Sequence, residues 1–184
     1  MNIFILSEDP RECAQMHCDK HVVKMIVESA QMLSTVHRML DGALTKKLSK
    51  SGKRMIQHWM HPDLDLENSL YKAVHMNHPC TVWSRMCSAN YQWHFELFYW
   101  LCKEYTYRYG KVHKTEQLLH DVLINYPKNI PPSSEKTPFK LAMGAAPECA
   151  DINNPVESYR KFYKTKQARF KMDWTKRNMP EWFK

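Results

Sequence analysis

Glycine is scarce in this chain: only four of its 184 residues are glycine, and neither GxGxxG nor GxxxxGK occurs. Loops that cradle the phosphates of dinucleotides or nucleoside triphosphates need these patterns. The sequence therefore excludes a Rossmann-type dinucleotide site and a P-loop. The few glycines, the twelve methionines and long segments of helical periodicity together predict a mainly α-helical protein.

Long apolar runs are also missing, because charges interrupt every apolar segment before it reaches 18 residues. The start of the sequence has no basic flank and no small-residue cleavage site. We therefore expect no membrane partner and no export. The length suits one domain over 1–184, which at this size buries roughly 70% of its unfolded surface and needs no disulfides. No obligate protein partner is evident.

The six cysteines include no CxxC pair, so we expect reduced thiols in the cytoplasm. Potential metal ligands do occur close together, as Cys13, His17 and His21 and again as the segment His75 to Cys80. However, HExxH and paired CxxC motifs are absent, and histidines four residues apart arise by chance in a histidine-rich chain. We therefore expect no metal and no other cofactor.

The patterns predict a single compact helical domain with a short N-terminal strand and a long proline-rich irregular segment before the C-terminal helix. Caps and breakers place the boundaries, with Asp9 and Pro10 opening the first helix and Asn154 and Pro155 opening the last. The expected elements are a strand at 3–6, a helix at 10–40 with a kink, a mobile basic loop at 43–66, helices at 66–76, 79–110 and 115–125, an irregular segment at 126–154, and a basic aromatic helix and tail at 155–184.

The stretch CDKHVVKMIVESAQMLSTVHR, residues 18 to 38, has unusual proportions for a helix. Its polar residues fall within roughly a 100° wedge, and apolar side chains occupy most of the remaining circumference. A surface helix has the reverse arrangement, with a broad charged face. The helix is therefore expected to be mostly buried with one thin polar line, formed by His17, His21, Lys24, Glu28, Gln31, Thr35 and Arg38.

Glu28 is the acid of this line. Desolvation on an apolar helix disfavours its charged form unless Lys24 or an arginine such as Arg38 or Arg85 compensates. Such an environment suits a carboxylate that transfers protons. Two structural alternatives remain: Glu28 and Lys24 form a buried ion pair, and His21 is a core histidine bonded to a carbonyl.

The tail at 155–184 holds nine Lys/Arg against three Asp/Glu, a net charge of +6 out of +8 for the chain. Aromatic residues are interleaved with these cations in SYRKFYKTKQARFKMDWTKR. Spaced cations suit a phosphate backbone and aromatic faces can stack on bases, so the tail is expected to bind nucleic acid. The alternative is a helix docked through its aromatic stripe with the lysines facing water.

The segments DKHVVKMIVESAQML, NHPCTVWSR…NYQW and YTYRYGKVHKT resemble a group of small proteins carried by bacteriophages and large DNA viruses, over most of the chain. More distantly, about 50 of the 184 residues are similar to the pyrimidine-dimer DNA glycosylases of the endonuclease V type. That family carries Asp-x-His and, seven residues after the histidine, a catalytic Glu. Asp19, His21 and Glu28 keep this spacing.

This resemblance implies a compact helical DNA glycosylase, of a kind that can also act as an abasic-site lyase, in which an amine forms a Schiff base at C1′. Glu28 is then the catalytic carboxylate, His21 a helper near the sugar, and Lys24 a residue for phosphate binding or charge tuning. One departure concerns the nucleophile. The family uses the α-amine of a small residue exposed by removal of Met, whereas position 2 is Asn here. The amine of Met1, Lys20, Lys24, or water activated by Glu28 or Asp19 therefore remain alternatives.

The expected partner is duplex DNA with a damaged or modified base, which must leave the stack before its glycosidic bond can be attacked. Trp83, Tyr91 and Trp93 are candidates to stack in the gap, the alternative being core packing. The expected DNA contacts are Lys20, Arg38, His78, Arg85, Arg160, Lys161, Lys164 and Arg169. A non-catalytic nucleic-acid-binding viral accessory protein and an enzyme acting on free nucleotides are the other two hypotheses.

Overall fold

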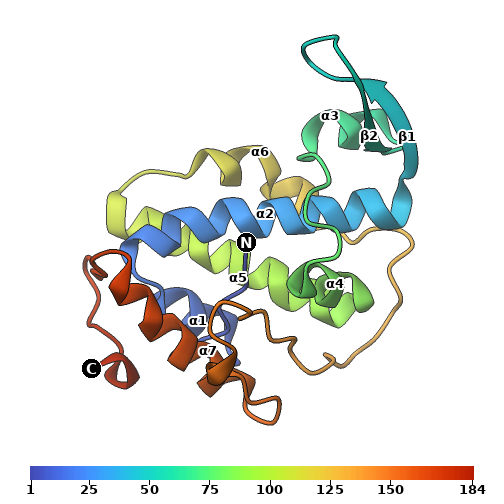
Figure 1. Cartoon of the computed structure of the whole chain (residues 1–184). Helices are drawn as coiled ribbons and strands as arrows, with labels where there is room; N and C mark the ends of the chain where they lie inside the picture. Colours follow the sequence, from blue (N-terminus) through green and yellow to red (C-terminus); the bar gives the residue numbers. More distant parts are fainter.

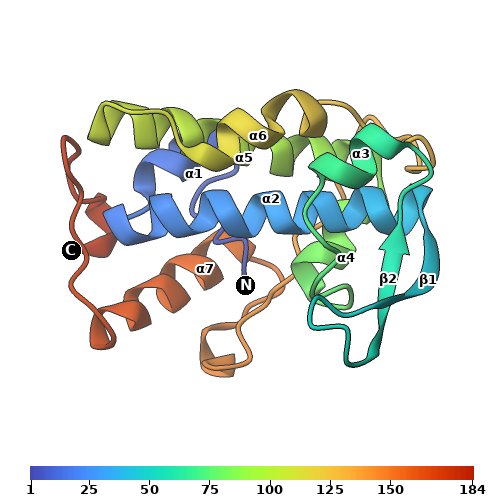
Figure 2. The ribbon, with the colours of Figure 1, turned by 90° about the horizontal axis from the view of Figure 1, so that it is seen from above.

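A computed structural model describes all 184 residues, and it confirms a mainly helical single domain around one core. Figure 2 shows the helices in three layers, with α2 running through the middle. Helices α1, α5 and α6 lie on one side of α2, and α7 and the N-terminus lie on the other. The helices and strands are α1 (Pro10–Met16), α2 (Asp19–Asp41), β1 (Ala43–Leu48), β2 (Met55–Met60), α3 (Leu64–Ser69), α4 (Pro79–Met86), α5 (Ser88–Tyr109), α6 (Lys114–Leu123) and α7 (Pro155–Lys164), with short 3-10 turns at Pro147–Cys149, Thr165–Ala168 and Glu181–Phe183.

The predicted first helix is interrupted at His17 and Cys18, so it forms two separate helices. Asp9 caps α1 as expected, with its side chain accepting from the amide of Glu12. At the break, the amide of Cys18 donates to the hydroxyl of Tyr163 at 2.9 Å. The C-terminal region therefore satisfies a backbone group that a continuous helix would have bonded internally.

The expected strand at 3–6 is wrong. Residues 3–6 are buried, but they have no regular secondary structure and pair with no strand. Thiols replace a strand partner: the amide of Ile3 donates to Cys80 Sγ at 3.4 Å, and the amide of Leu6 to Cys13 Sγ at 3.3 Å.

The expected loop at 43–66 is instead an ordered hairpin followed by α3. Strands β1 and β2 pair antiparallel, from Ala43 opposite Met60 to Leu48 opposite Met55. Gly42 allows the chain to enter this hairpin, because a Cβ there would lie 2.5 Å from the carbonyl oxygen of Arg38. The basic, Ser- and Gly-containing turn dominated the sequence pattern and hid two short strands on either side of it.

The other helices also differ from the expected bounds. The expected helix at 66–76 ends early, since α3 spans only Leu64–Ser69. The expected helix at 79–110 is interrupted at Cys87, where the amide of Ser88 donates to the carbonyl of Pro131. The irregular segment at 126–154 and the cap at Asn154 are confirmed, apart from one 3-10 turn. Figure 1 shows this segment running below α4 towards α7.

Arg38 connects α2 to the hairpin and α3. Its buried guanidinium forms an ion pair with Glu67 and donates to the carbonyls of Tyr71, Trp59, Glu67 and Leu70 at 2.7 to 2.9 Å. Partial burial would raise the pKa of Glu67, but hydrogen bonds from the amide of His61, from Arg38 and from His58 lower it to about 2. Arg38 is therefore a structural residue rather than the expected DNA contact.

Arg38→Ala should lower the free energy of unfolding by about 3 to 5 kcal/mol, because it removes the cationic partner of the partly buried Glu67 carboxylate and leaves four carbonyls without their donor. Urea unfolding monitored by circular dichroism measures this loss. Lys72→Ala is the control, since Lys72 is exposed and forms no ion pair. Equal stability of the two variants would contradict the structural role.

Candidate functional site

One hollow of about 300 Å³ brings together the start of the chain, the middle of α2 and the C-terminal region. Its floor is the N-terminal extended segment and its walls come from residues 142–145 and from the end of α7 onward. We call it the Glu28 pocket. The side chains and backbone that line it belong to Met1, Asn2, Phe4, His21, Lys24, Glu28, Ala142, Gly144, Ala145, Phe162, Lys166, Arg169 and Phe170.

Glu28 is the only carboxylate of this pocket, and several N–H groups surround it. Its Oε2 accepts from the amide of Asn2 at 2.9 Å and lies 3.8 Å from the amine of Met1. Its Oε1 lies 3.3 Å from Lys24 Nζ, one helical turn earlier. Glu28 is only 12% exposed, whereas Lys24 is 61% exposed. Of the expected line, the structure brings Lys24 and Glu28 into contact, and it adds the amine of Met1 to them.

The hydrogen bonds of Asn2 explain why this position holds a larger residue than the small one found in the resembled family. Its side chain is buried and donates to the carbonyl of Ala142 at 2.8 Å, while its Oδ1 accepts from the thiol of Cys80. Burial raises the pKa of Cys80 to about 11, so this thiol stays protonated as a donor. These hydrogen bonds of Asn2 thus hold the neighbouring Met1 and the wall segment at Ala142 in place.

Aromatic rings form the other wall. His21 stacks on Phe4 at 5.0 Å between centroids and meets Phe170 edge-on at 5.2 Å. Phe162 stacks on the far side of the same cluster, 5.9 Å from Phe4. Burial, reinforced by the charges of His17, Lys24 and Lys166, lowers the pKa of His21 to about 3. His21 is therefore neutral at physiological pH.

Lys166 is the one cation of this pocket that was not selected as a site residue from the sequence. Its side chain is buried, and its Nζ lies 3.4 Å from the centroid of the Phe162 ring. No carboxylate pairs with it. Burial first, and then the charges of Arg169 and Lys24, lower the pKa of its amine. The basic aromatic pattern of the tail was visible in the sequence, but its approach to Glu28 depends on how α7 docks.

The charges of the pocket are unbalanced. Four cationic groups, Met1 N, Lys24, Lys166 and Arg169, face the single carboxylate of Glu28. A concave site with this excess of positive charge favours an anionic ligand, and its aromatic wall favours a planar ring.

The structure places Asp19 and Lys20 outside this pocket. Asp19 bonds to Arg108 at 2.8 Å and to the hydroxyl and amide of Thr175. Partial burial would raise the pKa of Asp19, but these hydrogen bonds lower it below its usual value. Asp19 is therefore a structural residue at the start of α2. Lys20 is exposed and lies over the Phe170 ring at 5.0 Å, so it borders the aromatic wall.

His78 and Arg85 belong to α4. His78 caps the helix by accepting from the amide of Cys80, and its pKa is lowered by burial and then by the charge of the amine of Met1. It therefore lies near the Glu28 pocket without lining it. Arg85 is half-buried and donates to the carbonyl of Met76.

The four expected cations of the tail have different environments. Arg160 donates to the carbonyl of Leu6 and pairs with Glu157, so it helps to dock α7. Lys161 is exposed, and Lys164 reaches the carbonyl of Lys184. Arg169 is exposed and lines the pocket. Only part of the basic tail is thus free for an external partner.

Trp83, Tyr91 and Trp93 are not available as stacking residues, which corrects that expectation. All three are buried in the core, at 1%, 0% and 5% exposure. Their polar atoms donate to backbone carbonyls, with Trp83 bonded to Thr137 and Trp93 to Glu8. Their size predicted burial as well as stacking, and the core was the correct reading.

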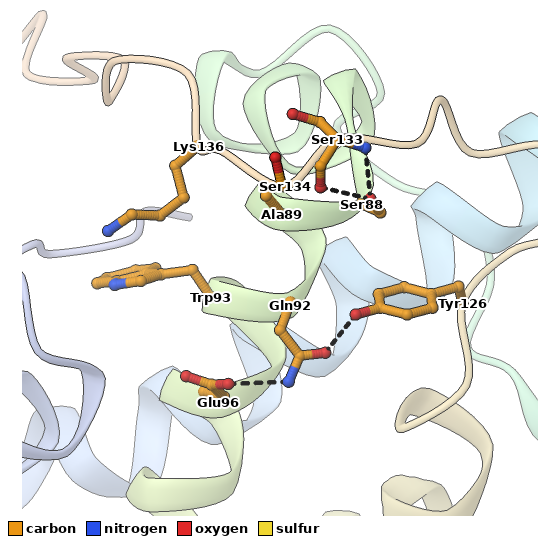
Figure 3. Close-up of a pocket in the computed structure, with 9 residues that line it drawn as sticks. All are labelled: Ser88, Ala89, Gln92, Trp93, Glu96, Tyr126, Ser133, Ser134 and Lys136. Atoms are coloured by element: carbon orange, nitrogen blue, oxygen red, sulfur yellow. Dashed lines mark hydrogen bonds between the residues drawn. The ribbon is translucent and has the colours of Figure 1, made fainter.

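A second hollow, of about 320 Å³, lies beside the start of α5 (Figure 3). Its side chains bond to one another: Gln92 donates to Glu96 and accepts from Tyr126. The amine of Lys136 lies above the ring of Trp93, at 5.5 Å from its centroid. No nucleophile faces a base or an acid here, so the Glu28 pocket is the better candidate for chemistry.

The structure contains neither a disulfide nor side chains arranged as a metal site. All six cysteines are free and buried. No group of three His, Cys, Asp or Glu side chains converges as a metal centre would require. No helix is long and apolar enough to cross a membrane.

Comparisons with known proteins place the chain in no family: no family model matches it, and neither the curated proteins nor the solved structures searched contain a match.

Acid should destabilise the protein through its buried histidines. Burial lowers the pKa to about 4 in His17 and His37 and to about 3 in His21 and His94, from an ordinary value of 6.5. Below pH 6.5 the unfolded chain therefore binds protons that the folded chain does not, which costs about 2 kcal/mol for each ring at pH 5. The free energy of unfolding in urea should fall by several kcal/mol between pH 7 and pH 5. Titration near pH 6.5 of the ring signals assigned to these four histidines in the folded protein would contradict this.

Proposed function

We propose that the protein is a DNA glycosylase of viral type that excises a damaged or modified base from duplex DNA. The observation that carries the proposal is the Glu28 carboxylate, held within 4 Å of two amines in a pocket with aromatic walls and excess positive charge. The spacing of Asp19, His21 and Glu28 supports it through the resemblance to pyrimidine-dimer glycosylases. The free thiols fit a cytoplasmic setting.

The pocket suits a nucleotide that has left the helical stack. Extruding a base costs a few kcal/mol, which stacking on aromatic side chains and contacts to its flanking phosphates must offset. Phe170 and His21 offer ring faces or edges, and Arg169 and Lys24 offer cations at the rim. A volume of about 300 Å³ lies at the lower end of the range for small-ligand sites.

The proposed reaction begins with a neutral amine of the pocket. Its nitrogen forms a bond to C1′ as the glycosidic bond breaks, and the base leaves with the bonding electron pair and one proton from the amine. The C1′–O4′ bond then breaks, O4′ takes the second amine proton, and an imine remains. Glu28 lies where it can accept each proton and return it to the leaving atom.

Two amines are the strongest candidates for this nucleophile. Met1 N lies 3.8 Å from the carboxylate. Lys166 is buried without an anionic partner, and its lowered pKa increases the neutral fraction that can attack. Lys24 is mostly exposed and ion-paired with Glu28, which favours a role at the rim. Asp19 is bonded elsewhere, so water activation by Asp19 has no support from the geometry.

The other two hypotheses differ from this one in measurable ways. A non-catalytic DNA-binding protein would bind duplex DNA without releasing any base. An enzyme acting on free nucleotides would also use the four cations of the pocket, but it would turn over mononucleotides and would gain nothing from a long duplex.

Glu28→Gln should reduce base release by roughly 10²-fold or more, because it keeps the shape of the side chain but removes the proton-transfer group. Release is measured on duplex oligonucleotides that each carry one defined lesion or modified base. DNA affinity and the thermal unfolding midpoint should change little. Glu135→Gln is the matched control, since Glu135 is exposed and its side chain makes no hydrogen bond.

A structural role for Glu28 predicts the opposite pattern. The amide of Asn2 and the amine of Met1 would lose an ionic acceptor, so the unfolding midpoint would drop by several degrees while base release stayed at the wild-type rate. That outcome would end the catalytic assignment.

Sodium borohydride should trap the protein covalently on DNA that contains an abasic site, because it reduces the imine to a stable secondary amine. Mass spectrometry of the adduct then locates the modified nitrogen at Met1 or Lys166. Lys166→Arg keeps the charge but removes the neutral amine, so it should abolish trapping only if Lys166 is the nucleophile. Base release without any adduct would show that water attacks instead.

A further inference from the structure

The hairpin formed by β1 and β2 carries the strongest local excess of positive charge outside the tail. Between residues 43 and 60 there are five Lys/Arg and no Asp or Glu. None of the five forms an ion pair. Lys47 bonds to His58 on the inner face, and the exposed cations are Lys46, Lys50, Lys53 and Arg54. The exposed cations of the hairpin therefore form no ion pairs within the protein and remain available to an external partner.

The outer face of the hairpin combines these cations with exposed apolar side chains. The register places Lys46 opposite Gln57 on this face, and Leu48 opposite Met55 next to the turn. Leu48 is 59% exposed and Met55 is 55% exposed. Because Leu48 and Met55 are a cross-strand pair, they form one contiguous exposed apolar patch, and such patches are more typical of contact surfaces than single exposed side chains are.

The base of the hairpin is held firmly. Arg38 donates to the carbonyl of Trp59, and His58 bonds to Glu67 at 2.7 Å. The two strands are therefore anchored to α2 and α3 at one end, while the turn at 49–54 extends away from the helices (Figure 1). A ribbon held in this way keeps its cations in a fixed direction, which reduces the entropy lost on binding.

The hairpin and the elements that line the Glu28 pocket project to the same side of α2 in one view. Figure 2 shows the turn of the hairpin, the N-terminus and α7 on one side of α2, whereas Figure 1 shows the turn above α2 and α7 below it, with the N-terminus between them. Along α2, Glu28 and the hairpin start at Ala43 are separated by about 20 Å, from the rise per residue of an α-helix. A partner lying across this side can reach the pocket and the hairpin together.

We propose that the β1–β2 hairpin enters a groove of duplex DNA beside the Glu28 pocket. Lys46, Lys50, Lys53 and Arg54 neutralise phosphates, and Leu48 and Met55 contact sugars and base edges within the groove. The inference rests on the proposed function for the choice of duplex DNA as the partner, but it does not require base excision.

The dimensions and chemistry of the hairpin fit this partner. A two-stranded ribbon is narrow enough to enter a DNA groove, and several DNA-binding proteins use one in this way. Lysine and glutamine beside exposed leucine and methionine are typical of proteins that contact or wedge open the minor groove. An anionic lipid surface would also attract a basic apolar hairpin, but it would not account for the shared direction of the hairpin and the pocket.

The test compares two triple variants of the whole protein. The hairpin variant carries Lys46→Ala, Lys50→Ala and Lys53→Ala, and the control carries Arg11→Ala, Lys111→Ala and Lys114→Ala. The control cations are also exposed and form no ion pair. Arg11 belongs to α1 and the two lysines lie at or just before the start of α6, and both helices lie on the opposite side of α2 from α7 and the N-terminus. Binding to an unmodified 30-base-pair duplex is measured by fluorescence anisotropy at several salt concentrations.

The hairpin variant should bind about tenfold or more weakly at 100 mM salt, and its slope of log affinity against log salt should be less steep by about 2 to 3, since each lost phosphate contact removes about 0.9. The control should match the wild type, and both variants should unfold at the wild-type temperature. A second variant, Leu48→Ser with Met55→Ser, should weaken binding without changing the slope.

Several results would overturn the inference. One is an unchanged slope and affinity in the hairpin variant. Another is binding of the wild type to single strands alone. A third is a hairpin variant that no longer binds vesicles containing phosphatidylserine but still binds duplex DNA like the wild type. The proposed function is judged separately. If the wild type binds through the hairpin but releases no base, only the glycosylase proposal is refuted. If the hairpin variant releases base and binds DNA normally, only the hairpin proposal is refuted.

Discussion

A helix that is covered on nearly every side must find a partner for each buried charge it carries, and this constraint determines much of the structure. Helix α2 has its apolar residues in the core and a thin polar line between them. At its start Asp19 is held by Arg108 and Thr175, and near its end Arg38 is held by Glu67 and four carbonyls. An unpaired buried charge would cost several kcal/mol, so these partners are necessary for folding. Glu28, in the middle, is the member whose partners are amines at an open pocket.

This difference between the ends and the middle of α2 separates structure from candidate chemistry. The guanidinium of Arg38 has no remaining donor that a ligand could use in place of its internal partners without loss of stability. Glu28 instead shares its oxygens with the amide of Asn2, the amine of Met1 and an exposed lysine. Exchange of one of these for a substrate group costs little, because water can solvate Lys24 when it moves away.

Local patterns in the sequence were sufficient to predict the helical class and several boundaries. The caps at Asp9 and Asn154 involve residues within three positions of each other, so neighbouring letters contain the necessary information. The periodicity of residues 18 to 38 likewise predicted a buried helix with a polar line. By contrast, the partners of Arg38 lie 21 to 33 positions away, and Lys166 reaches the Glu28 pocket only because α7 docks on the N-terminal segment. Such contacts depend on tertiary structure and leave no periodic signal.

The aromatic residues illustrate the same limit. Trp83, Tyr91 and Trp93 stood beside a helix-opening turn and were selected for stacking, yet each lies in the core. Phe162 and Phe170 each follow a basic residue in a tail for which docking on the protein was the alternative to nucleic-acid binding. The structure shows this docking, because Phe162 packs on Phe4 and Phe170 on His21, while Arg169 remains exposed at the pocket. The sequence showed where aromatic residues occur, but not which of them face solvent.

The arrangement of charge along one side of the molecule separates two tasks that a base-excising protein must perform. About 20 Å along α2 corresponds to roughly six base pairs at 3.4 Å each. A hairpin that grips DNA at that distance would hold intact duplex, where the groove keeps its regular shape, while the Glu28 pocket receives a nucleotide from a distorted region. Affinity would then come mainly from phosphates that are the same in every sequence, and selectivity from the cost of extruding a base, which is lowest for a damaged or mispaired one. Because the two sites share α2 but no side chains, changes in one should alter binding without altering the chemistry of the other.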